Sequence, residues 1–309
     1  MAAKGLRFRP ADVVALGTPA LLLAIAAVGG RSAEWIGPAL IWASVLACGF
    51  TIVVLRSFVA GRVMDVIGTF WVALAIPAVY GTLNLVIDLL NPRLFDELLL
   101  QVDLNLFGTH PSVWLEGRMP RWSIDLMILC YASFYFWPLV LAAILYAKGK
   151  RRQVDHLALL IVLGFFTNYV GYVSVPLVGP RFAIAPLYDG FPQGWLVGTD
   201  LWRSFLYIPT LRDCFPSGHT AMTLLTLAFA YSRLRWFFFA MLPVAIPLIA
   251  ATVALRFHYT ADLVLAVPFA FVVWFLATVW HERSEWKEGL VEGESDIEET
   301  GERSSAAAV

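Results

Sequence analysis

Eight long apolar runs, separated by short polar segments, constrain the fold of this chain more than any other feature of its sequence. They lie at roughly residues 11–28, 35–55, 66–90, 124–147, 156–178, 217–233, 236–255 and 259–280. A helix that crosses a bilayer needs about 20 mostly apolar residues, and most of these runs have that length. The sequence therefore predicts an all-α, polytopic membrane protein with about eight transmembrane helices.

The composition agrees with this interpretation. The 309-residue chain is 60% hydrophobic and only 15% charged, whereas charged residues make up about a quarter of a typical soluble domain. Its 12 Trp and 22 Phe suit the interfaces of a membrane, where aromatic rings are enriched. The formal net charge of -1 indicates no nucleic-acid partner. Three widely spaced cysteines predict neither a disulfide framework nor a zinc site.

Lysine and arginine in the short loops predict the orientation, because they are enriched in the cytoplasmic loops of membrane proteins. The strongest such signal is the basic cluster at 148–152. With eight spans, both termini share the side of this cluster, and we expect both to be cytoplasmic. The longer loops 91–123 and 179–216 then lie on the extracytoplasmic side.

Three further segments are the first apolar run, the 91–123 loop and the C-terminal tail. Basic residues precede the first run, as in a signal peptide, but no good small-residue cleavage site follows, so we expect a retained helix. The 91–123 loop interleaves apolar and acidic residues; it either lies in the headgroup plane or is an ordinary ordered loop. The tail at 281–309 is acidic and then Ser/Ala-rich, and we expect it to be disordered and cytoplasmic.

The motif Cys214-Phe-Pro-Ser-Gly-His-Thr220 opens the sixth run. Helix N-termini present unpaired N–H groups and the positive end of a dipole, so they bind phosphate readily. Gly218 would let a ligand approach the backbone, and Ser217 could cap the helix or donate to a phosphoryl oxygen. His219 could then protonate a leaving oxygen as a general acid. The alternative is a capped helix with a chance histidine.

A second motif, Arg256-Phe-His-Tyr-Thr-Ala-Asp262, opens the last run. His258 and Asp262 are four residues apart at the start of a helix, so they share one face. A carboxylate that binds one imidazole nitrogen fixes the tautomer and leaves the other nitrogen free as a nucleophile. The alternative is a polar pair that joins two helices.

Two arginines lie near these motifs in the predicted topology. Arg181 ends the fifth run and Arg256 precedes His258 by two residues. Either could clamp phosphoryl oxygens, or could extend toward lipid headgroups as interfacial arginines do. Since both motifs and Arg181 are predicted on the same side of the membrane, the pattern favours one shared site for displacement at phosphorus.

These motifs resemble the signatures of the type 2 phosphatidic acid phosphatase (PAP2) superfamily, which are KxxxxxxRP, PSGH and SRxxxxxHxxxD. The second signature matches fully at 216–219, and the third matches at His258 and Asp262. Thr252 stands at the arginine position of the third signature. The resemblance covers roughly 124–280 and implies a six-helix core.

The first signature is degenerate, because Arg181 follows a proline and Ser174 stands where the lysine would be. The resemblance implies that residues 66–280 form a membrane-embedded catalytic domain. The two helices within residues 1–65 are then additional, and the 281–309 tail lies outside the domain.

The resemblance implies an enzyme that needs neither metal nor cofactor. His258 attacks phosphorus and forms a phosphohistidine, and Asp262 orients it. His219 protonates the departing alkoxide and then deprotonates the acceptor. The groups implied to hold the phosphoryl oxygens are Arg181, Ser217, Gly218 and Arg256.

The departures from the signatures resemble the sphingolipid branch that includes inositol phosphorylceramide synthases. This implies transfer of a phosphoinositol-like headgroup from a phospholipid donor to a lipid hydroxyl. One alternative is a lipid phosphate phosphatase that uses water on phosphatidate or a prenyl diphosphate, and another is a non-catalytic lipid-binding membrane protein. The loop residues that could contact the acceptor are His110, Glu116, Asp189, Asp200 and Asp213.

Overall fold

The computed structural model of the chain describes residues 6–29, 33–195 and 212–306. It is 80% helical, and these three ranges contain no β-strand. The all-α fold predicted from the sequence is therefore confirmed.

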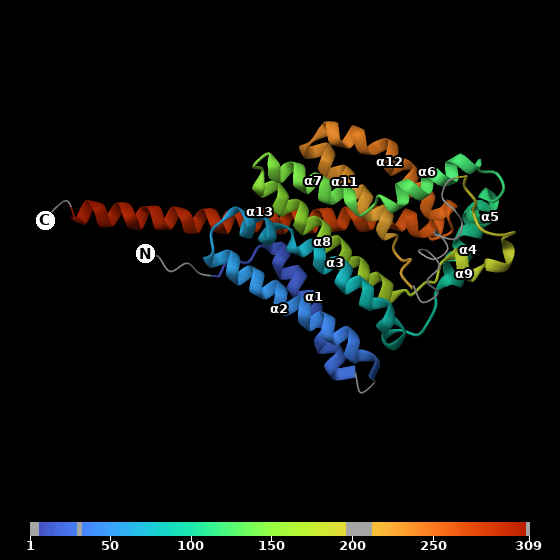
Figure 1. The fold of residues 1–309 in the computed structure, drawn as a ribbon, viewed down its shortest axis with the longest axis horizontal. Coiled ribbons are helices and arrows are strands. Elements are labelled where there is room, and N and C mark those ends of the chain that lie inside the picture. The colour runs from blue at the N-terminus through green and yellow to red at the C-terminus, as the bar shows by residue number, and fades with distance from the viewer. Residues whose placement is uncertain (1–5, 30–32, 196–211, 307–309) are drawn as a thin grey trace.

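Figure 1 labels the helices in chain order. The helices and short 3-10 turns are α1 (Pro10–Gly29), η1 (Ala33–Trp35), α2 (Ile36–Phe58), α3 (Arg62–Leu90), α4 (Asp96–Phe107), α5 (Pro111–Leu115), α6 (Arg121–Ala132), α7 (Phe136–Ala147), α8 (Arg151–Ser174), α9 (Pro180–Ala183), η2 (Ala185–Leu187), α11 (Gly218–Arg233), α12 (Arg235–Ala254) and α13 (Thr260–Ala306).

Within the described ranges, six helices are long and apolar enough to cross a membrane, which indicates an integral membrane protein. They are α1, α2 with its leading turn, α3, α8, α12 and α13 as far as Ser284. The consecutive helices α6 and α7 meet at a bend of 51° and would make a seventh span if taken together. The predicted count of eight is not confirmed, because α11 has only 16 residues and begins at a buried turn.

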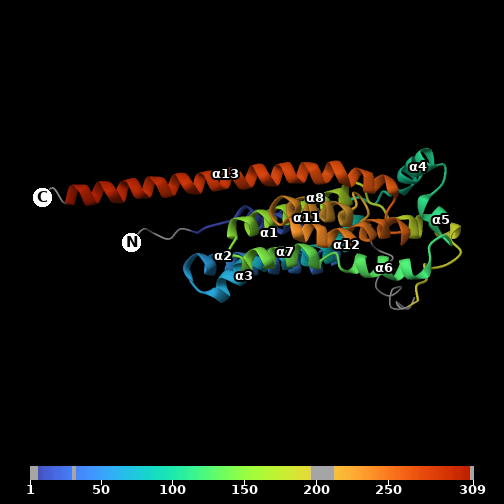
Figure 2. The same cartoon turned by 90° about the horizontal axis from the view of Figure 1, so that it is seen from above.

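The long helices run side by side along one axis, and α4, α5 and α9 gather at one end of the bundle (Figures 1 and 2). The start of α1 and the far end of α13 lie toward the opposite end. The helix α13 continues to Ala306 through most of the segment for which we expected disorder. Glu, which is frequent there, has good intrinsic helix propensity.

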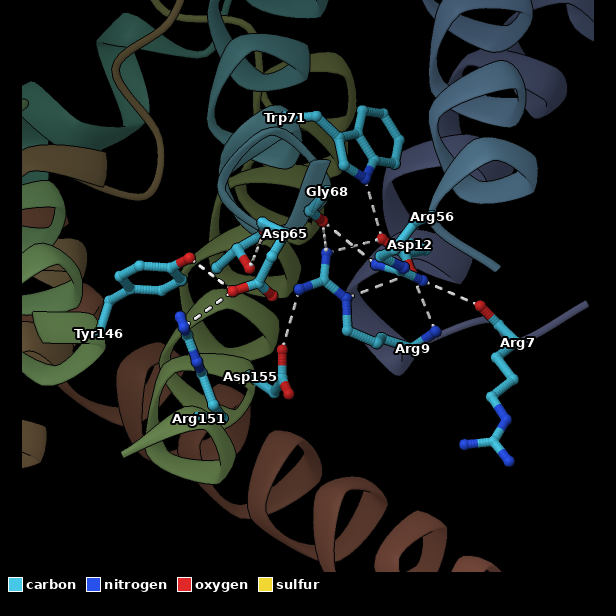
Figure 3. Close-up of polar contacts among 11 residues, drawn as sticks. Arg7, Arg9, Asp12, Arg56, Asp65, Gly68, Trp71, Tyr146, Arg151 and Asp155 are labelled. Atoms are coloured by element: carbon cyan, nitrogen blue, oxygen red, sulfur yellow. Dashed lines mark hydrogen bonds and ion pairs between the residues drawn. The ribbon is translucent and has the colours of Figure 1, made fainter. Parts of the chain in front are cut away.

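A network of charges around the buried Asp12, near the start of α1, connects the first two helices to the rest of the bundle (Figure 3). The fully buried Asp12 pairs with Arg9 at 3.0 Å and with Arg56 of α2 at 2.7 Å, and it accepts a hydrogen bond from the Trp71 indole of α3. Arg9 also pairs with Asp155 of α8 at 2.9 Å. Since unpaired charges are costly in a membrane, these contacts fix α1 and α2 against α3 and α8.

A smaller apolar cluster organises the other end of the bundle. Leu99 and Leu100 of α4 belong to it together with Leu177, Cys214 and Tyr259. Leu177, Cys214 and Tyr259 come from the three separate segments that carry the sequence motifs. The helix α4 therefore forms a common support beneath those segments.

Candidate active site

The side chains of His219 and His258 face each other across the centre of the candidate site. Their ring centroids are 6.0 Å apart, with an angle of 62° between the ring planes. His219 lies in the first turn of α11, and His258 lies in the turn just before α13. The two motifs that the sequence placed on one side thus meet, and both imidazoles can reach one phosphoryl group.

His258 and Asp262 make the predicted contact. The His258 Nδ1 group donates a hydrogen bond of 3.2 Å to Asp262 Oδ2. Both side chains are buried, at 4% and 0% exposure. This bond holds the imidazole through one nitrogen and leaves Nε2 available for attack on a substrate.

The backbone around His258 is fixed by two other segments. The Thr252 carbonyl accepts hydrogen bonds of 2.9 Å from the N–H groups of both Phe257 and His258. The Asp103 carboxylate of α4 accepts bonds from the N–H groups of Thr260 and Ala261, at 3.0 and 2.9 Å. These two N–H groups open α13, so Asp103 caps the helix that carries Asp262.

Burial raises the pKa of the Asp103 carboxyl, and the hydrogen bonds from Thr260 and Ala261 only partly offset that effect. Asp103 is also almost fully buried in the structure. A buried carboxylate in this position forms a directional cap, since its acceptors meet two N–H donors that would otherwise be unpaired.

A second buried carboxylate of α4, Asp96, connects two chain segments of the site. It accepts hydrogen bonds from the N–H groups of Val178 and Gly179, at 3.2 and 2.9 Å. It also accepts a bond of 2.6 Å from the Tyr259 hydroxyl. The segment before Arg181 and the segment after His258 are therefore joined through one side chain.

Asp96 and Asp103 were not among the predicted site residues; in the sequence they form the polar part of an amphipathic segment. The two residues are seven positions apart and therefore share one face of α4. In the structure this face points into the protein, while Leu98, Leu106 and Phe107 are exposed. The spacing of the two acids on one helix face was the only sequence feature that could have identified them as site residues.

Ser217 caps α11, which is one of the two roles that the sequence allowed. It is the N-cap of α11, where its hydroxyl accepts a hydrogen bond from the Thr220 N–H and donates one of 3.0 Å to Thr220 Oγ1. Asn168 of α8 donates a bond of 2.8 Å to the Pro216 carbonyl. These contacts orient the first turn of α11 and with it the His219 side chain.

Gly218 and Gly179 are required by close contacts. A Cβ atom on Gly218 would lie 2.6 Å from Asn168 Oδ1 and 2.7 Å from the Tyr172 hydroxyl. Gly179 has a φ of +82°, and a Cβ atom there would lie 2.7 Å from the Phe257 carbonyl oxygen. Larger residues at either position would push apart the segments that form the site.

Aromatic rings enclose His219. The ring of Tyr131 stacks on it, with centroids 4.2 Å apart, and the ring of Phe134 lies at 4.3 Å. The Tyr131 hydroxyl is 3.5 Å from His219 Nδ1, at the limit of a hydrogen bond. Tyr131 also stacks on Phe257, next to His258, so one ring braces both histidine segments.

Arg181 lies beside both histidine segments. It is buried, its N–H donates a hydrogen bond of 3.0 Å to the Arg256 carbonyl, and its guanidinium lies 4.8 Å from the centroid of the Phe257 ring. Its charge is also close enough to interact electrostatically with His219. The arginine at the end of the fifth run therefore joins the histidines, as the sequence predicted.

Arg256 makes different contacts from those expected of a phosphate ligand. Its guanidinium pairs with Glu116 at 2.6 Å, donates to the Gly190 carbonyl and lies 3.7 Å from the centroid of the Tyr188 ring. The backbone at Arg256 has a φ of +70°, a left-handed turn that the sequence did not reveal. These contacts link the turn before His258 to the two segments that carry Glu116 and Gly190.

The remaining loop candidates are distributed around this core. Asp213 accepts a short hydrogen bond from the Tyr80 hydroxyl, and the Asp189 N–H donates to Glu116. Asp200 lies outside the described residues. His110 precedes α5 as its N-cap residue.

A comparison with known protein families identifies the region of the chain that holds the candidate site. A family model described as the PAP2 superfamily matches residues 98–276. No curated protein and no solved structure gave a significant match. The matched region begins in α4, ends in α13, and includes Asp103, both histidines and Asp262.

Proposed function

Because the chain belongs to the PAP2 superfamily, whose members are generally phosphatases or phosphotransferases, we propose that it is a membrane-embedded lipid phosphotransferase. It moves a phosphoinositol-like headgroup from a phospholipid to the hydroxyl of a lipid acceptor through a phosphohistidine. The observation that carries this proposal is the arrangement of His219 and His258, with ring centroids 6.0 Å apart and His258 oriented by Asp262.

In the first step, His258 Nε2 attacks the phosphorus of the donor lipid. The N–P bond forms while the P–O bond to the lipid alkoxide breaks, and His219 gives its proton to that oxygen. Asp262 stabilises the positive charge that develops on the His258 ring. The headgroup phosphate remains on the enzyme, and the first lipid product carries a free hydroxyl.

In the second step, His219 acts as a base. It removes the proton from the acceptor hydroxyl, whose oxygen attacks the phosphorus as the N–P bond breaks. Both histidines return to their starting protonation states. Arg181 and the N–H groups that open α11 stabilise the charge on the phosphoryl oxygens in both steps.

The contacts of Arg256 favour a phosphodiester donor over a phosphomonoester. Arg256, one of the two arginines that the sequence assigned to phosphate, pairs with Glu116. The arginine position of the third signature is occupied by the uncharged Thr252. A phosphodiester carries one negative charge and needs fewer cations than the dianion of phosphatidate. A lipid phosphate phosphatase, in which water resolves the same intermediate, is therefore the second candidate.

The proposed orientation in the membrane follows from the basic residues. The basic cluster at 148–152 covers the turn between α7 and α8 and the first residues of α8, at the end of the bundle that also holds the start of α1 (Figure 1). The positive-inside rule assigns this end to the cytoplasm. The site then lies on the extracytoplasmic side, and both termini are cytoplasmic.

A product assay on purified protein in mixed micelles tests the function. Headgroup-labelled phosphatidylinositol is supplied with a ceramide or diacylglycerol acceptor, and phosphatidate is supplied in parallel. A new labelled lipid that His258→Ala fails to make would support the transferase. Release of inorganic phosphate from phosphatidate without transfer would support the phosphatase, and binding of lipid without either product would support a non-catalytic role.

A further inference from the structure

An apolar cavity of about 370 Å³ lies between α3, α7 and α8. Val72, Leu157 and Val162 form its buried floor, whereas Leu74 and Leu139 at its rim are exposed. The cavity is therefore closed toward the protein core and open toward the outer surface of helices that have membrane-spanning length.

One end of this cavity is next to the candidate site. Phe134 and Tyr135 line the cavity, and their ring centroids lie 4.3 and 6.4 Å from that of His219. Both residues occupy the break between α6 and α7, where the chain bends by 51°. The break thus supplies a wall that faces the histidine on one side and the cavity on the other.

The cavity extends far along α8. Its lining runs from Phe165, which packs on Phe134, back to Val154. At a rise of about 1.5 Å per residue, this stretch of helix is about 17 Å long. One leaflet of a bilayer has a hydrocarbon layer of about 15 Å, half the usual core thickness. The cavity therefore has the length of a lipid chain.

We infer that this cavity receives one hydrocarbon chain of the lipid whose phosphate lies between His219 and His258. The inference rests on the proposed function and names the part of the substrate that the site recognises besides the phosphate. The chain enters sideways from the bilayer, between the exposed Leu74 of α3 and Leu139 of α7.

The cavity contributes alignment rather than affinity. Lipid tails are as apolar as the cavity lining, so moving a chain from the bilayer into the cavity gains little from the hydrophobic effect. A chain held along α8 instead limits where its phosphate can lie relative to His258 Nε2, and such positioning accelerates a reaction. The expected selectivity is for donors with long chains.

Filling the cavity tests this inference. Ala142→Trp and Ala158→Trp place a large side chain on its lining, and Ala43→Trp on the exposed face of α2 is the matched control. We compare kcat/KM for long-chain and dibutanoyl phosphatidylinositol. The long-to-short ratio should fall about tenfold or more in the cavity variants, because the long chain can no longer align its phosphate. An unchanged ratio would overturn the inference.

A labelling experiment gives a readout that does not need turnover. A long-chain alkyl phosphonate with a diazirine at its far end is photolysed with the protein in nanodiscs, and the labelled peptides are mapped. We expect labels on α7 and α8 near Ala142 and Ala158, lost in Ala158→Trp and reduced by competing phosphatidylinositol. Labels elsewhere would overturn the inference even if the enzyme transfers headgroups.

An alkane diazirine without a phosphonate distinguishes the two sources of a hydrocarbon chain. Equal labelling of the cavity by this probe would mean that any bilayer lipid occupies it, which contradicts a substrate site. Phosphonate-dependent labelling without transfer or hydrolysis in the product assay would keep the cavity as a lipid site and refute the proposed function.

Discussion

The Asp96 carboxylate accepts a hydrogen bond of 2.6 Å from the Tyr259 hydroxyl, although 163 positions separate the two residues. Through this bond α4 holds the residue that directly follows His258. The same carboxylate binds the N–H groups of Val178 and Gly179, just before Arg181. Burial and the Asp96 charge raise the pKa of Tyr259, so the hydroxyl stays protonated and remains a donor.

Asp96→Asn should reduce turnover more than it reduces thermal stability. The amide keeps the shape of the side chain but cannot accept all three bonds, and a lost bond to a charged group costs about 1.5–3 kcal/mol. The segments that carry Arg181 and His258 should then shift, and misplacement of these side chains should lower kcat about 10- to 100-fold. Tyr259→Phe, which removes one of the three bonds, should have a smaller effect. Equal losses in both variants would argue against the bridging role.

The stability difference between the wild type and Asp103→Asn should depend on pH. Burial raises the pKa of Asp103, so the folded state binds this proton more tightly than the unfolded state. Stability then falls as pH rises past the ordinary carboxyl pKa of about 3.9, because ionisation is less favourable in the folded protein. The asparagine variant lacks this titration.

Thermal unfolding of both proteins from pH 4 to pH 7 measures the effect. The advantage of the wild type over Asp103→Asn should shrink with increasing pH. An advantage that grows with pH would mean that the two N–H bonds outweigh burial. Glu97→Gln, on the exposed part of the same helix, should show no comparable trend.

Gly218→Ala should abolish most turnover. A Cβ atom would lie 2.6 Å from Asn168 Oδ1, so the first turn of α11 must shift away from α8, and overpacking of this kind costs about 1–3 kcal/mol. Gly81→Ala is the matched control, since a Cβ atom in that helical position meets nothing within 4 Å. It should keep full activity and equal or higher stability. Wild-type activity in Gly218→Ala would contradict the packing argument.

The helices and the histidine contacts could be predicted because their causes are local. Long apolar runs identify membrane helices by length alone. A histidine and an aspartate four residues apart meet on one helix face, as His258 and Asp262 do. The run at 217–233 corresponds to α11 within one residue, but this helix has fewer residues than the roughly 20 that a membrane-spanning helix needs.

The supporting carboxylates could not be predicted because their partners are remote in sequence. Asp96 and Asp103 lie more than 150 positions from Tyr259 and Thr260, and no local pattern identifies such pairs. The surroundings of Arg256 were equally hard to predict. It was assigned to phosphate because it precedes His258, but its left-handed turn and the remote Glu116 determine where its side chain lies.

The pairing of Arg256 with Glu116 predicts that the two residues compensate for each other. Removing one partner of a buried ion pair leaves an uncompensated charge and costs about 3–5 kcal/mol, whereas replacing both with apolar residues can be nearly neutral. Arg256→Leu should therefore lower thermal stability and turnover, and adding Glu116→Leu should restore much of both.

Arg181→Gln provides the contrast, because it should lower kcat/KM by about 100-fold or more through lost stabilisation of the phosphoryl charge. No substitution of Glu116 should rescue it. A double-mutant cycle on Arg256 and Glu116 should yield a coupling free energy in the range of about 0.5–3 kcal/mol. If Glu116→Leu failed to rescue Arg256→Leu and the latter raised KM for phosphatidate alone, Arg256 would be a phosphate ligand, and the preference for a phosphodiester donor would lose its main support.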